Sequence, residues 1–365
     1  MAAVPVSATI PADVLHSFVR QVFERAGVPA EQASDAADVL LYASRRGVDT
    51  HGVRNLKPIY FDGFASGVLK AQAEYKIEYE TPLTARVDGG HGLGLAASVW
   101  AMRLAMQKAQ QSGIGMVAMR NSHHYGAAGY YPYMALQKDM IGICMTARIY
   151  ARDHDYGVIP TFGAKSRFST NPLSISFPTQ AEPPWLLDMA TSTVPFNRVL
   201  MMRDNNQQIP LGWGVDANGV PTTDPGQVSF LSPLGGTREQ GSHKGYGLAM
   251  MVSVLCNLLA GGWDDLYGDD PSAFDGYKVD GDSHFFAALR VDLFRPLDDF
   301  KRGMDAMIRA LHDTPKAPGH DRVYVAGEIE HETEQQRLRD GIPLTPVVLD
   351  DLRALSAQYG VPFEV

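Results

Sequence analysis

The segment LGLAASVWAMRLAMQKAQQSGIGMVAM, residues Leu93–Met119, sets a pattern that continues downstream. It predicts a helix from about Leu93 to Gln111 and an apolar strand at Ile114–Met119. The same order follows directly, with a helix expected from about Ala127 to Lys138 and a strand at Ile141–Ala147. Because helices that alternate with apolar strands are typical of a layered α/β core, the predicted fold class is α/β.

Short strands flank this core on both sides. Residues 75–80 alternate apolar and charged side chains, and Pro82 turns the chain into a second strand at Thr84–Val87, as in an antiparallel hairpin. Further strands are expected at Leu173–Phe177, Trp185–Met189 and Phe285–Val291. Because hairpins are combined with helix-to-strand units, the pattern predicts a mixed sheet flanked by helices.

The first 75 residues predict a helical lobe. Apolar residues recur at helical spacing from Leu15 to Phe23, and again on a helix that starts near Pro29. The second helix leads into the polar segment Ser44–Arg54, SRRGVDTHGVR, and a third helix bent at Pro58 is expected after it. The polar segment should therefore lie at a helix end, beside whatever these helices pack on.

The segment Ser44–Arg54 combines groups suited to acid/base chemistry on an anion. His51 can both donate and accept a proton at working pH, because the ordinary pKa of histidine lies near neutrality. Arg46 and Arg54 carry guanidinium groups that match a planar carboxylate. The segment favours proton transfer to a small, carboxylate-bearing substrate, and a solvated polar turn between helices is the alternative.

Composition limits the class of protein. The chain has 365 residues, more than one hydrophobic core usually supports, which favours two or more lobes. A net charge of -9 without a long basic run argues against binding to nucleic acid or to an anionic membrane. Cys144 and Cys256 each lie in an apolar run, so we expect a reducing cytoplasm and no disulfide framework. We also expect no signal peptide and no membrane span.

The common nucleotide-binding and hydrolase motifs are absent from the sequence. Gly90, Gly92 and Gly94 approach G-x-G-x-x-G but have the wrong final spacing, and no P-loop, H-E-x-x-H or G-x-S-x-G sequence occurs. Ordinary Rossmann dehydrogenases, P-loop NTPases, zincins and serine hydrolases are therefore disfavoured.

Three glycine-flanked polar clusters remain. Asn121–Gly129, NSHHYGAAG, follows a strand and opens a helix, where backbone amides can hold an anion. Trp185–Ser192 places Asp188 at the end of an apolar strand, where a carboxylate needs a partner such as a histidine, whose pKa it would raise. Gly241–Gly247, GSHKGYG, resembles a phosphate-binding turn with Lys244 facing the anion. The structural alternatives are a surface loop, a loop cap and an ordinary helix start.

Taken together, these clusters resemble the malate/L-lactate dehydrogenase family, whose members lack a Rossmann fold. The family includes sulfolactate, ureidoglycolate and diketogulonate oxidoreductases and reductases of cyclic imino acids. The matching pieces follow the family's order over nearly the whole chain: Arg46–Gly52, Asn121–Gly126, Thr170–Pro172, Asp188–Ser192, Gly219–Pro225, His243–Gly247, Gly327–Glu328 and Gly341–Pro343. The resemblance implies a sulfolactate dehydrogenase-like fold, in which an N-terminal helical lobe accompanies a layered non-Rossmann mixed sheet.

The resemblance also implies roles for particular residues. His51 is the expected proton donor or acceptor and Asp188 its orienting partner; His124 matches a second candidate base, so the assignment between the two histidines is open. Substrate contacts are expected at Ser44, Arg46, Arg54 and Thr170. Contacts with a nicotinamide cofactor, NAD or NADP, are expected at His123, Arg148, Asn171, Asp188, Met189, Ala190, Thr191, Ser192, His243, Lys244, Gly327 and Glu328. The resemblance implies no metal, and it implies a homodimer with the site near the subunit boundary.

The chain is expected to divide into three regions. Residues 1–75 form the helical lobe and pack with the C-terminal segment 290–365. Residues 76–120 and 175–290 form a cofactor-binding mixed-sheet region, and residues 121–174 form a smaller substrate and cofactor region.

The predicted activity is hydride transfer between a nicotinamide and the alpha carbon of a small 2-hydroxy or 2-keto acid, with His51 transferring the proton. The first alternative is reduction of a cyclic imino acid, such as piperideine-2-carboxylate or pyrroline-2-carboxylate. The others are a cofactor-free lyase or isomerase that uses His51 and Asp188, and a non-catalytic binding protein. Departures from the family pattern at Ser169, at Asn197-Arg198 and at Ala326 leave the choice between NAD and NADP open.

Overall fold

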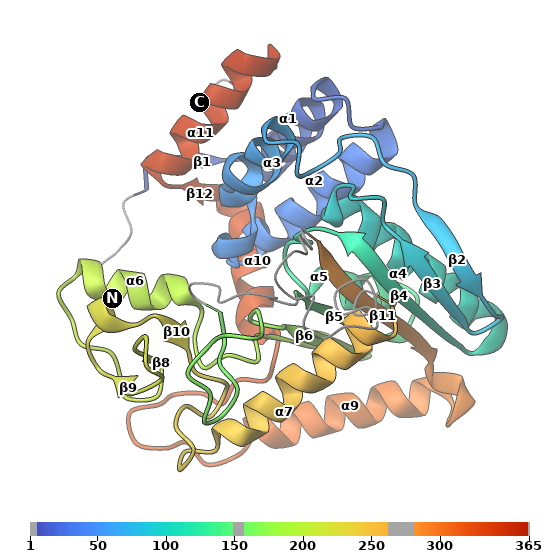
Figure 1. The fold of residues 1–365 in the computed structure, drawn as a ribbon. Coiled ribbons are helices and arrows are strands. Elements are labelled where there is room, and N and C mark those ends of the chain that lie inside the picture. Colours follow the sequence, from blue (N-terminus) through green and yellow to red (C-terminus); the bar gives the residue numbers. More distant parts are fainter. Residues whose placement is uncertain (1–5, 149–156, 262–280, 364–365) are drawn as a thin grey trace.

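A seven-stranded mixed sheet forms the centre of the protein (Figure 1). The computed structural model describes residues 6–148, 157–261 and 281–363. The strand order is β2-β3-β4-β11-β5-β6-β7. The strands are β2 (Lys76–Glu80), β3 (Thr84–Asp88), β4 (Ile114–Ser122), β5 (Met140–Ala147), β6 (Leu173–Phe177), β7 (Trp185–Met189) and β11 (Asp282–Arg290). The predicted α/β class and mixed sheet are confirmed.

Strand β11 lies in the middle of the sheet although it comes late in the chain. It pairs antiparallel with both β4 and β5. In contrast, β3 and β4 are parallel, and the helix α4 (Gly94–Ser112) connects them. Asp282 at the start of β11 and Arg290 at its end therefore mark opposite ends of the central strand.

The two faces of β11 belong to different apolar clusters. Phe286 and Ala288 pack into the large core on the side of α4, whereas Phe285 and Ala287 pack on the other side. There they meet the buried residues of α7 (Ser242–Ser253) and of the π-helical segment η5 (Val254–Leu258). This alternation is what a strand buried on both faces requires.

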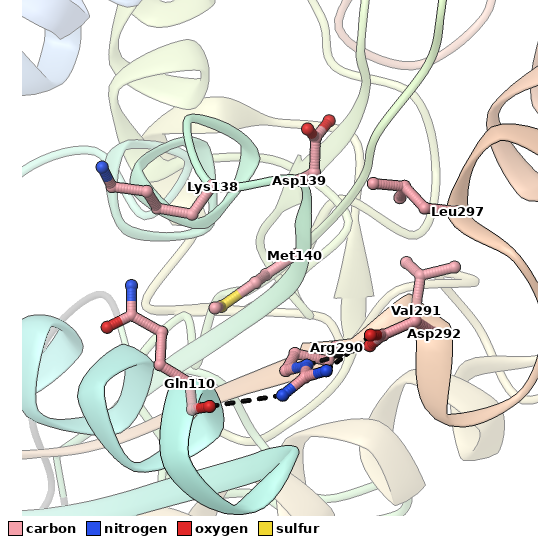
Figure 2. Close-up of a pocket in the computed structure, with 8 residues that line it drawn as sticks. All are labelled: Gln110, Lys138, Asp139, Met140, Arg290, Val291, Asp292 and Leu297. Atoms are coloured by element: carbon pink, nitrogen blue, oxygen red, sulfur yellow. Dashed lines mark hydrogen bonds and ion pairs between the residues drawn. The ribbon is translucent and has the colours of Figure 1, made fainter.

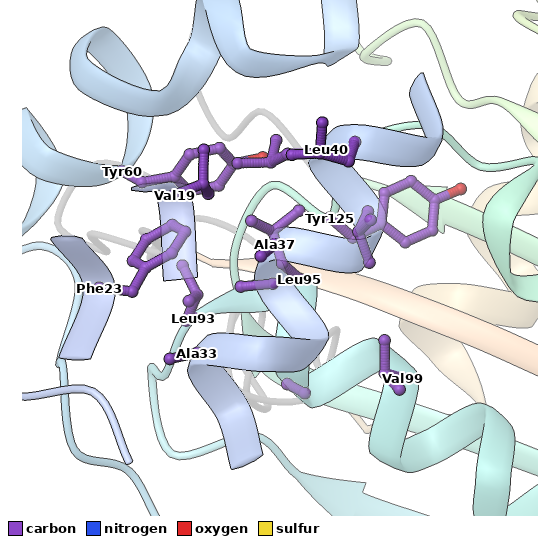
Figure 3. Close-up of a cluster of buried hydrophobic side chains, with 14 of the residues drawn as sticks. Val19, Phe23, Ala33, Ala37, Leu40, Tyr60, Leu93, Leu95, Val99 and Tyr125 are labelled. Carbon is purple, nitrogen blue, oxygen red and sulfur yellow. The ribbon is translucent and has the colours of Figure 1, made fainter. Parts of the chain in front are cut away.

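The large core joins the helical lobe to the sheet. Helices α1 (Ala12–Arg25) and α2 (Ala30–Arg45) contribute the buried side chains that meet α4 in Figure 3. From α1 and α2 they include Val19, Phe23, Ala33, Ala37 and Leu40, and from α4 they meet Leu95 and Val99. Burial of each larger one contributes about 1.5–3 kcal/mol. Because the core is continuous, the polar segment after α2 is held against the sheet.

The N-terminal and C-terminal segments also meet. Strand β1 (Ala8–Ile10) pairs antiparallel with β12 (Ile342–Leu344). Helix α10 (Glu328–Asp340) contacts α2, and α11 (Pro346–Tyr359) contacts α1. The division into the regions 1–75 with 290–365, 76–120 with 175–290, and 121–174 stays a prediction.

The expected third helix is present, but it is not a regular α-helix. After α2 and the short turn η1 (Asp49–His51), the chain is helical without a break through η2 (Val53–Asn55), the π-helical segment η3 (Leu56–Phe61) and α3 (Asp62–Ala65). The predicted helix is therefore confirmed, and its geometry changes along its length. Pro58 has no N–H to donate, and its ring clashes with the preceding turn, so a regular α-helix cannot run through this position.

The remaining elements surround the sheet. Helix α5 (Tyr130–Leu136) packs on β5 and β6. A second sheet has the order β10-β8-β9, formed by Phe230–Leu231, Gly214–Val215 and Pro221–Thr222. Helix α6 (Phe196–Asp204), the turns η4 (Pro225–Gln227) and η7 (Val291–Leu293), and α9 (Leu297–His312) complete the described chain. Every helix within these described ranges is too short or too polar to cross a membrane.

Candidate active site

A cavity of about 440 Å³ lies where the helical lobe meets the ends of β4 and β5 and the start of β11. We call it the histidine cavity. Its lining residues are His51, Pro58, Ile59, Tyr60, Gly63, Val68, Leu69, His123, His124, Tyr125, Gly126, Thr146, Arg148, Ser169, Thr170, Pro172 and Asp282. Of the residues predicted from sequence, it brings together His51, His123, His124, Arg148 and Thr170.

The turn that carries His51 is fastened to the end of α2. The Ser44 hydroxyl accepts a hydrogen bond from the Val53 backbone N–H at 3.0 Å. A Cβ at Gly52 would lie 2.2 Å from that hydroxyl oxygen, so only glycine fits there. Ser44 is buried and does not line the cavity. Its hydroxyl shapes the turn, and its expected substrate contact stays a prediction.

Two imidazole rings face each other in the cavity. The rings of His51 and His124 stack with their centroids 5.7 Å apart and their planes 17° from parallel. Thr50 Oγ1 lies 2.9 Å from His51 Nδ1, so one nitrogen of this ring has a hydroxyl partner. Burial lowers the pKa of His51, and burial together with the neighbouring His51 lowers the pKa of His124 to about 3. Both rings are therefore neutral at pH 7.

A partly buried ion pair stands beside the two histidines. Arg148 Nε donates to Asp282 Oδ1 at 2.8 Å. Burial raises the pKa of Asp282, but the Arg148 guanidinium and the nearby histidines outweigh it, so the pKa lies below its usual value. Sequence reasoning missed Asp282; the one signal for it was a carboxylate placed directly before an apolar strand.

The hydroxyl of Tyr60 was also missed. It lies 2.8 Å from His124 Nδ1, and the side chain is fully buried. In the sequence, Tyr60 is one of several aromatic residues at apolar spacing, so the pattern identified a core residue and gave no sign of a polar contact.

The predicted carboxylate-binding arginines do not line the cavity. Arg46 is 5% exposed, and its guanidinium donates to Glu334 Oε2 at 2.9 Å and to the Gly327 carbonyl at 3.2 Å. Arg54 is exposed on the outside of its turn. In this structure Arg46 joins α2 to α10, and neither arginine lines the cavity, so both expected substrate contacts stay predictions. Arg148 is the one arginine or lysine among the described residues that line the cavity.

Asp188 does not pair with His51. Its carboxylate accepts a hydrogen bond from the Gly129 backbone N–H at 2.7 Å, and burial raises its pKa to about 6. Glu330 and Arg46 are the charged groups that influence it. In this structure the carboxylate fixes the start of α5 and does not line the cavity, so its orienting role toward His51 stays a prediction.

Most of the other expected cofactor contacts lie outside the cavity lining. Thr191 bonds through its N–H to the Thr170 carbonyl at 2.9 Å, and Ser192 Oγ donates to the Val194 carbonyl. The Asn171 amide donates to Ala249 and Ser253 of α7. Met189 is the last residue of β7, and Ala190 follows it. This region is thus tied to the cavity wall through Thr170.

Two further expected contacts lie at helix starts. His243 and Lys244 are exposed in the first turn of α7, where Arg238 lies 3.0 Å from His243 Nδ1. Gly327 precedes α10 with a φ of 89°, and Glu328 is buried, where it binds Arg322 and the Val325 N–H. In this chain Glu328 therefore serves the local structure.

One ring nitrogen of His123, in the cavity wall, has no hydrogen-bond partner among the described residues. His123 is 4% exposed, and its Nε2 makes no hydrogen bond within the described part of the chain. An unsatisfied buried polar atom costs about 1–3 kcal/mol. A polar ligand at this position would remove that cost, so the cavity fits a group such as the carboxamide of a nicotinamide.

The mixed sheet and the cavity with two stacked histidines define an α/β enzyme that lacks a Rossmann sheet. A family model described as malate/L-lactate dehydrogenase matches residues 10–353. The chain belongs to the malate/L-lactate dehydrogenase family and is an oxidoreductase, as predicted. Dehydrogenases of this family generally use nicotinamide cofactors.

Relatives cover almost the whole chain. A malate dehydrogenase from Pyrococcus abyssi is 40% identical over 356 residues, which cover 96% of this chain and 95% of the relative. The structure of a malate dehydrogenase from Entamoeba histolytica matches with a TM-score of 0.87 at 34% identity, covering 98% of this chain and 99% of the other. A sulfolactate dehydrogenase structure from Methanocaldococcus jannaschii matches with a TM-score of 0.83 at 30% identity, covering 97% and 98%. The predicted sulfolactate dehydrogenase-like fold is confirmed.

Proposed function

We propose that this protein transfers a hydride between a nicotinamide cofactor and the alpha carbon of a small 2-hydroxy or 2-keto acid. The observation that carries the proposal is the stacked pair of His51 and His124 in a cavity of about 440 Å³. Enzyme pockets of this size commonly bind small ligands. The fold around the pair is that of enzymes named malate and sulfolactate dehydrogenases.

The bound cofactor would supply or remove the hydride, and the residues of the chain do the rest. His123 and Thr170 line the cavity and are the candidates for holding the reactive ring. His243 and Lys244, exposed at the start of α7, are candidates for the phosphates, because helix N-termini and lysines favour anions.

Proton transfer is assigned to His51. The neutral ring takes the hydroxyl proton of the substrate during oxidation as a general base, and the protonated ring gives this proton back to the substrate oxygen during reduction as a general acid. The Thr50 hydroxyl on Nδ1 holds the ring in place while Nε2 serves the substrate.

We assign to Arg148 the binding of the substrate carboxylate, which the sequence predicted for Arg46 and Arg54. Arg148 is the cationic side chain among the described lining residues, and its Nε donates a hydrogen bond to Asp282. Guanidinium groups suit planar carboxylates, so Arg148 is the candidate for holding the carboxylate of the substrate.

An absorbance assay at 340 nm tests the proposal. Oxaloacetate, pyruvate and further 2-keto acids are offered with NADH and with NADPH, and piperideine-2-carboxylate is offered in parallel. We expect oxidation of at least one reduced cofactor with a keto acid, and the comparison of the two cofactors decides between NAD and NADP. Turnover of the imino acid alone would contradict the keto-acid assignment, and failure of both cofactors to bind in a fluorescence titration would contradict the redox function.

A homodimer and a cytoplasmic location belong to the same proposal. The face of α7 and η5 exposes Met250, Met251, Leu258 and Leu259 to solvent, with Leu259 53% exposed. Large apolar side chains that are exposed on one part of a protein suit a subunit interface. Sedimentation of the purified protein at micromolar concentration should give the mass of two chains.

A further inference from the structure

Two hydrogen-bond donors converge on one nitrogen of His124. Tyr60 Oη lies 2.8 Å from His124 Nδ1, and the Gly126 backbone N–H donates to the same nitrogen at 3.3 Å. No hydrogen bond of Nε2 to another described residue occurs, so this nitrogen is left for the cavity that His124 lines.

This arrangement fixes the tautomer of the ring. A neutral imidazole has one N–H donor and one acceptor nitrogen. A backbone N–H can only donate, so Nδ1 must be the acceptor and the Tyr60 hydroxyl must donate to it as well. The proton of the neutral ring is therefore on Nε2.

We propose that Tyr60 is a positioning residue that holds His124 in its Nε2–H tautomer, so that His124 donates a fixed hydrogen bond to the substrate oxygen and His51 carries the proton. The inference rests on the proposed function, which supplies the substrate oxygen that His124 contacts. The two histidines then have different roles. In reduction the neutral His124 polarises the carbonyl by donating a hydrogen bond, and the new hydroxyl proton comes from the protonated form of His51, which becomes neutral. In oxidation the same proton returns to His51.

The fold gives Tyr60 the rigidity that this role needs. The residue lies in the π-helical segment η3, a rare geometry that is frequent at functional sites. Its ring is fully buried and contacts Phe23 edge-on with the centroids 6.4 Å apart, as Figure 3 shows for the surrounding core. A side chain packed in this way cannot turn its hydroxyl away from His124 without opening the core.

The charged and titratable groups around His124 favour its neutral form. His51 from η1, Tyr60 from η3, Arg148 after β5, and Asp282 and His284 from β11 face the ring. Asp282 alone favours a positive charge on His124, and Arg148 and the other histidines oppose it. A neutral donor in this position resembles the neutral histidine that polarises a carbonyl in other enzymes.

Nitrogen NMR of histidine-labelled protein tests the inference without turnover. In the wild-type protein we expect the His124 Nε2 signal to be that of a protonated nitrogen and the Nδ1 signal that of an acceptor, unchanged from pH 5.5 to 8.5. The signals are assigned by their loss in His124→Asn. In Tyr60→Phe we expect the two tautomers to mix, with kcat reduced by about tenfold and the dissociation constant of NADH or NADPH unchanged.

Tyr75→Phe is the matched control, because it also deletes a buried tyrosine hydroxyl, one without a hydrogen-bond partner. It should leave the His124 signals and kcat as they are. A wild-type ring that is protonated on Nδ1, or that titrates near neutral pH, would overturn the inference even if Tyr60→Phe does not fold. Absence of cofactor-dependent turnover with the expected tautomer in place would contradict the proposed function and not the state of the ring.

Discussion

Two cavities lie at opposite ends of the central strand, and each contains an arginine–aspartate pair. At the start of β11, Arg148 binds Asp282 in the histidine cavity, and the Asp282 side chain is 14% exposed. At the end of β11, a second cavity of about 330 Å³ is lined by Arg290 and Asp292, whose side chains are 40% and 48% exposed. Figure 2 shows Arg290 turned toward Asp292 and the Gln110 carbonyl, which it binds at 3.3 Å.

The two pairs differ in the exposure of the aspartate and in their neighbours, and this difference makes the pair in the histidine cavity a candidate functional group. In the second cavity solvent screens both members of the pair, and no histidine is among the described residues of its lining. In the histidine cavity Arg148 is 33% exposed, but the aspartate is largely buried and the pair stands beside three imidazoles. Electrostatic interactions are stronger there because little water is present to weaken them.

The largest expected effect comes from removing the proton carrier of the histidine cavity. We expect His51→Ala to lower kcat by about two to four orders of magnitude, the usual contribution of a general acid or base. Cofactor affinity, measured by fluorescence titration, should stay near that of the wild type. His16→Ala, which removes a partly exposed histidine paired with Asp38 outside both cavities, is the control. Equal losses in the two variants would show that His51 acts only through stability.

Matched substitutions of the two arginines test the comparison directly. Arg148→Met should raise KM for the acid and lower kcat/KM by roughly 10–100-fold, because hydrogen bonds to charged groups contribute about 1.5–3 kcal/mol. Arg290→Met should change kcat/KM by less than about twofold, as expected for a surface substitution. Steady-state kinetics with varied acid at saturating cofactor gives both values. Similar losses at both positions would remove the distinction between the cavities.

Buried histidines should also make the fold sensitive to acid. Burial lowers the pKa of His284 to about 4, whereas an unfolded histidine has a pKa of about 6.5. Since the folded pKa is the lower one, the stabilising contribution is complete above about pH 6.5 and is lost as the pH falls toward 4. We expect the free energy of unfolding to fall by up to about 1.4 kcal/mol per pH unit for this group.

Urea denaturation between pH 4.5 and 7 measures this slope. His284→Gln should flatten it, because glutamine stays neutral and can still bond to Thr146, which lies 2.8 Å from His284 Nδ1. The same substitution at His16 should leave the slope as it is. A slope that His284→Gln does not change would mean that this histidine is not held neutral by the fold.

The sequence could predict the elements and the presence of the site, but not its contacts. Periodicity identified the strands of the sheet, and the resemblance to the family implied that His51, His123 and His124 belong to one site. No periodicity could show that β11 inserts between β4 and β5, because that pairing is set by contacts between distant segments. For this reason the sequence analysis did not predict Asp282 as a residue of the site.

The surroundings of Arg46 could not be predicted from the sequence for a related reason. A guanidinium beside a histidine in the sequence suits a carboxylate of any origin, and in the folded chain Arg46 finds Glu334, 288 residues away. Whether an arginine faces a ligand or a structural partner depends on side chains that local sequence does not reveal.

The smallest expected effect concerns an aspartate outside both cavities. Burial raises the pKa of Asp188 to about 6, above the value of about 3.9 in an unfolded chain. Its stabilising contribution is therefore present below about pH 4 and is lost as the pH rises through 6. Asp188→Asn stays neutral and can still accept the Gly129 N–H, so it should raise Tm by a few degrees at pH 7.5 and less at pH 5.

Calorimetry at the two pH values measures the difference in Tm, and the pH dependence of kcat/KM is followed in the same variant. The acidic limb of that profile should not move, because Asp188 does not contact His51 and only burial affects the pKa of that histidine. A shift of the limb to lower pH would place the carboxylate beside His51 in the working enzyme. It would restore the pairing that the sequence first suggested and extend the histidine cavity as far as β7.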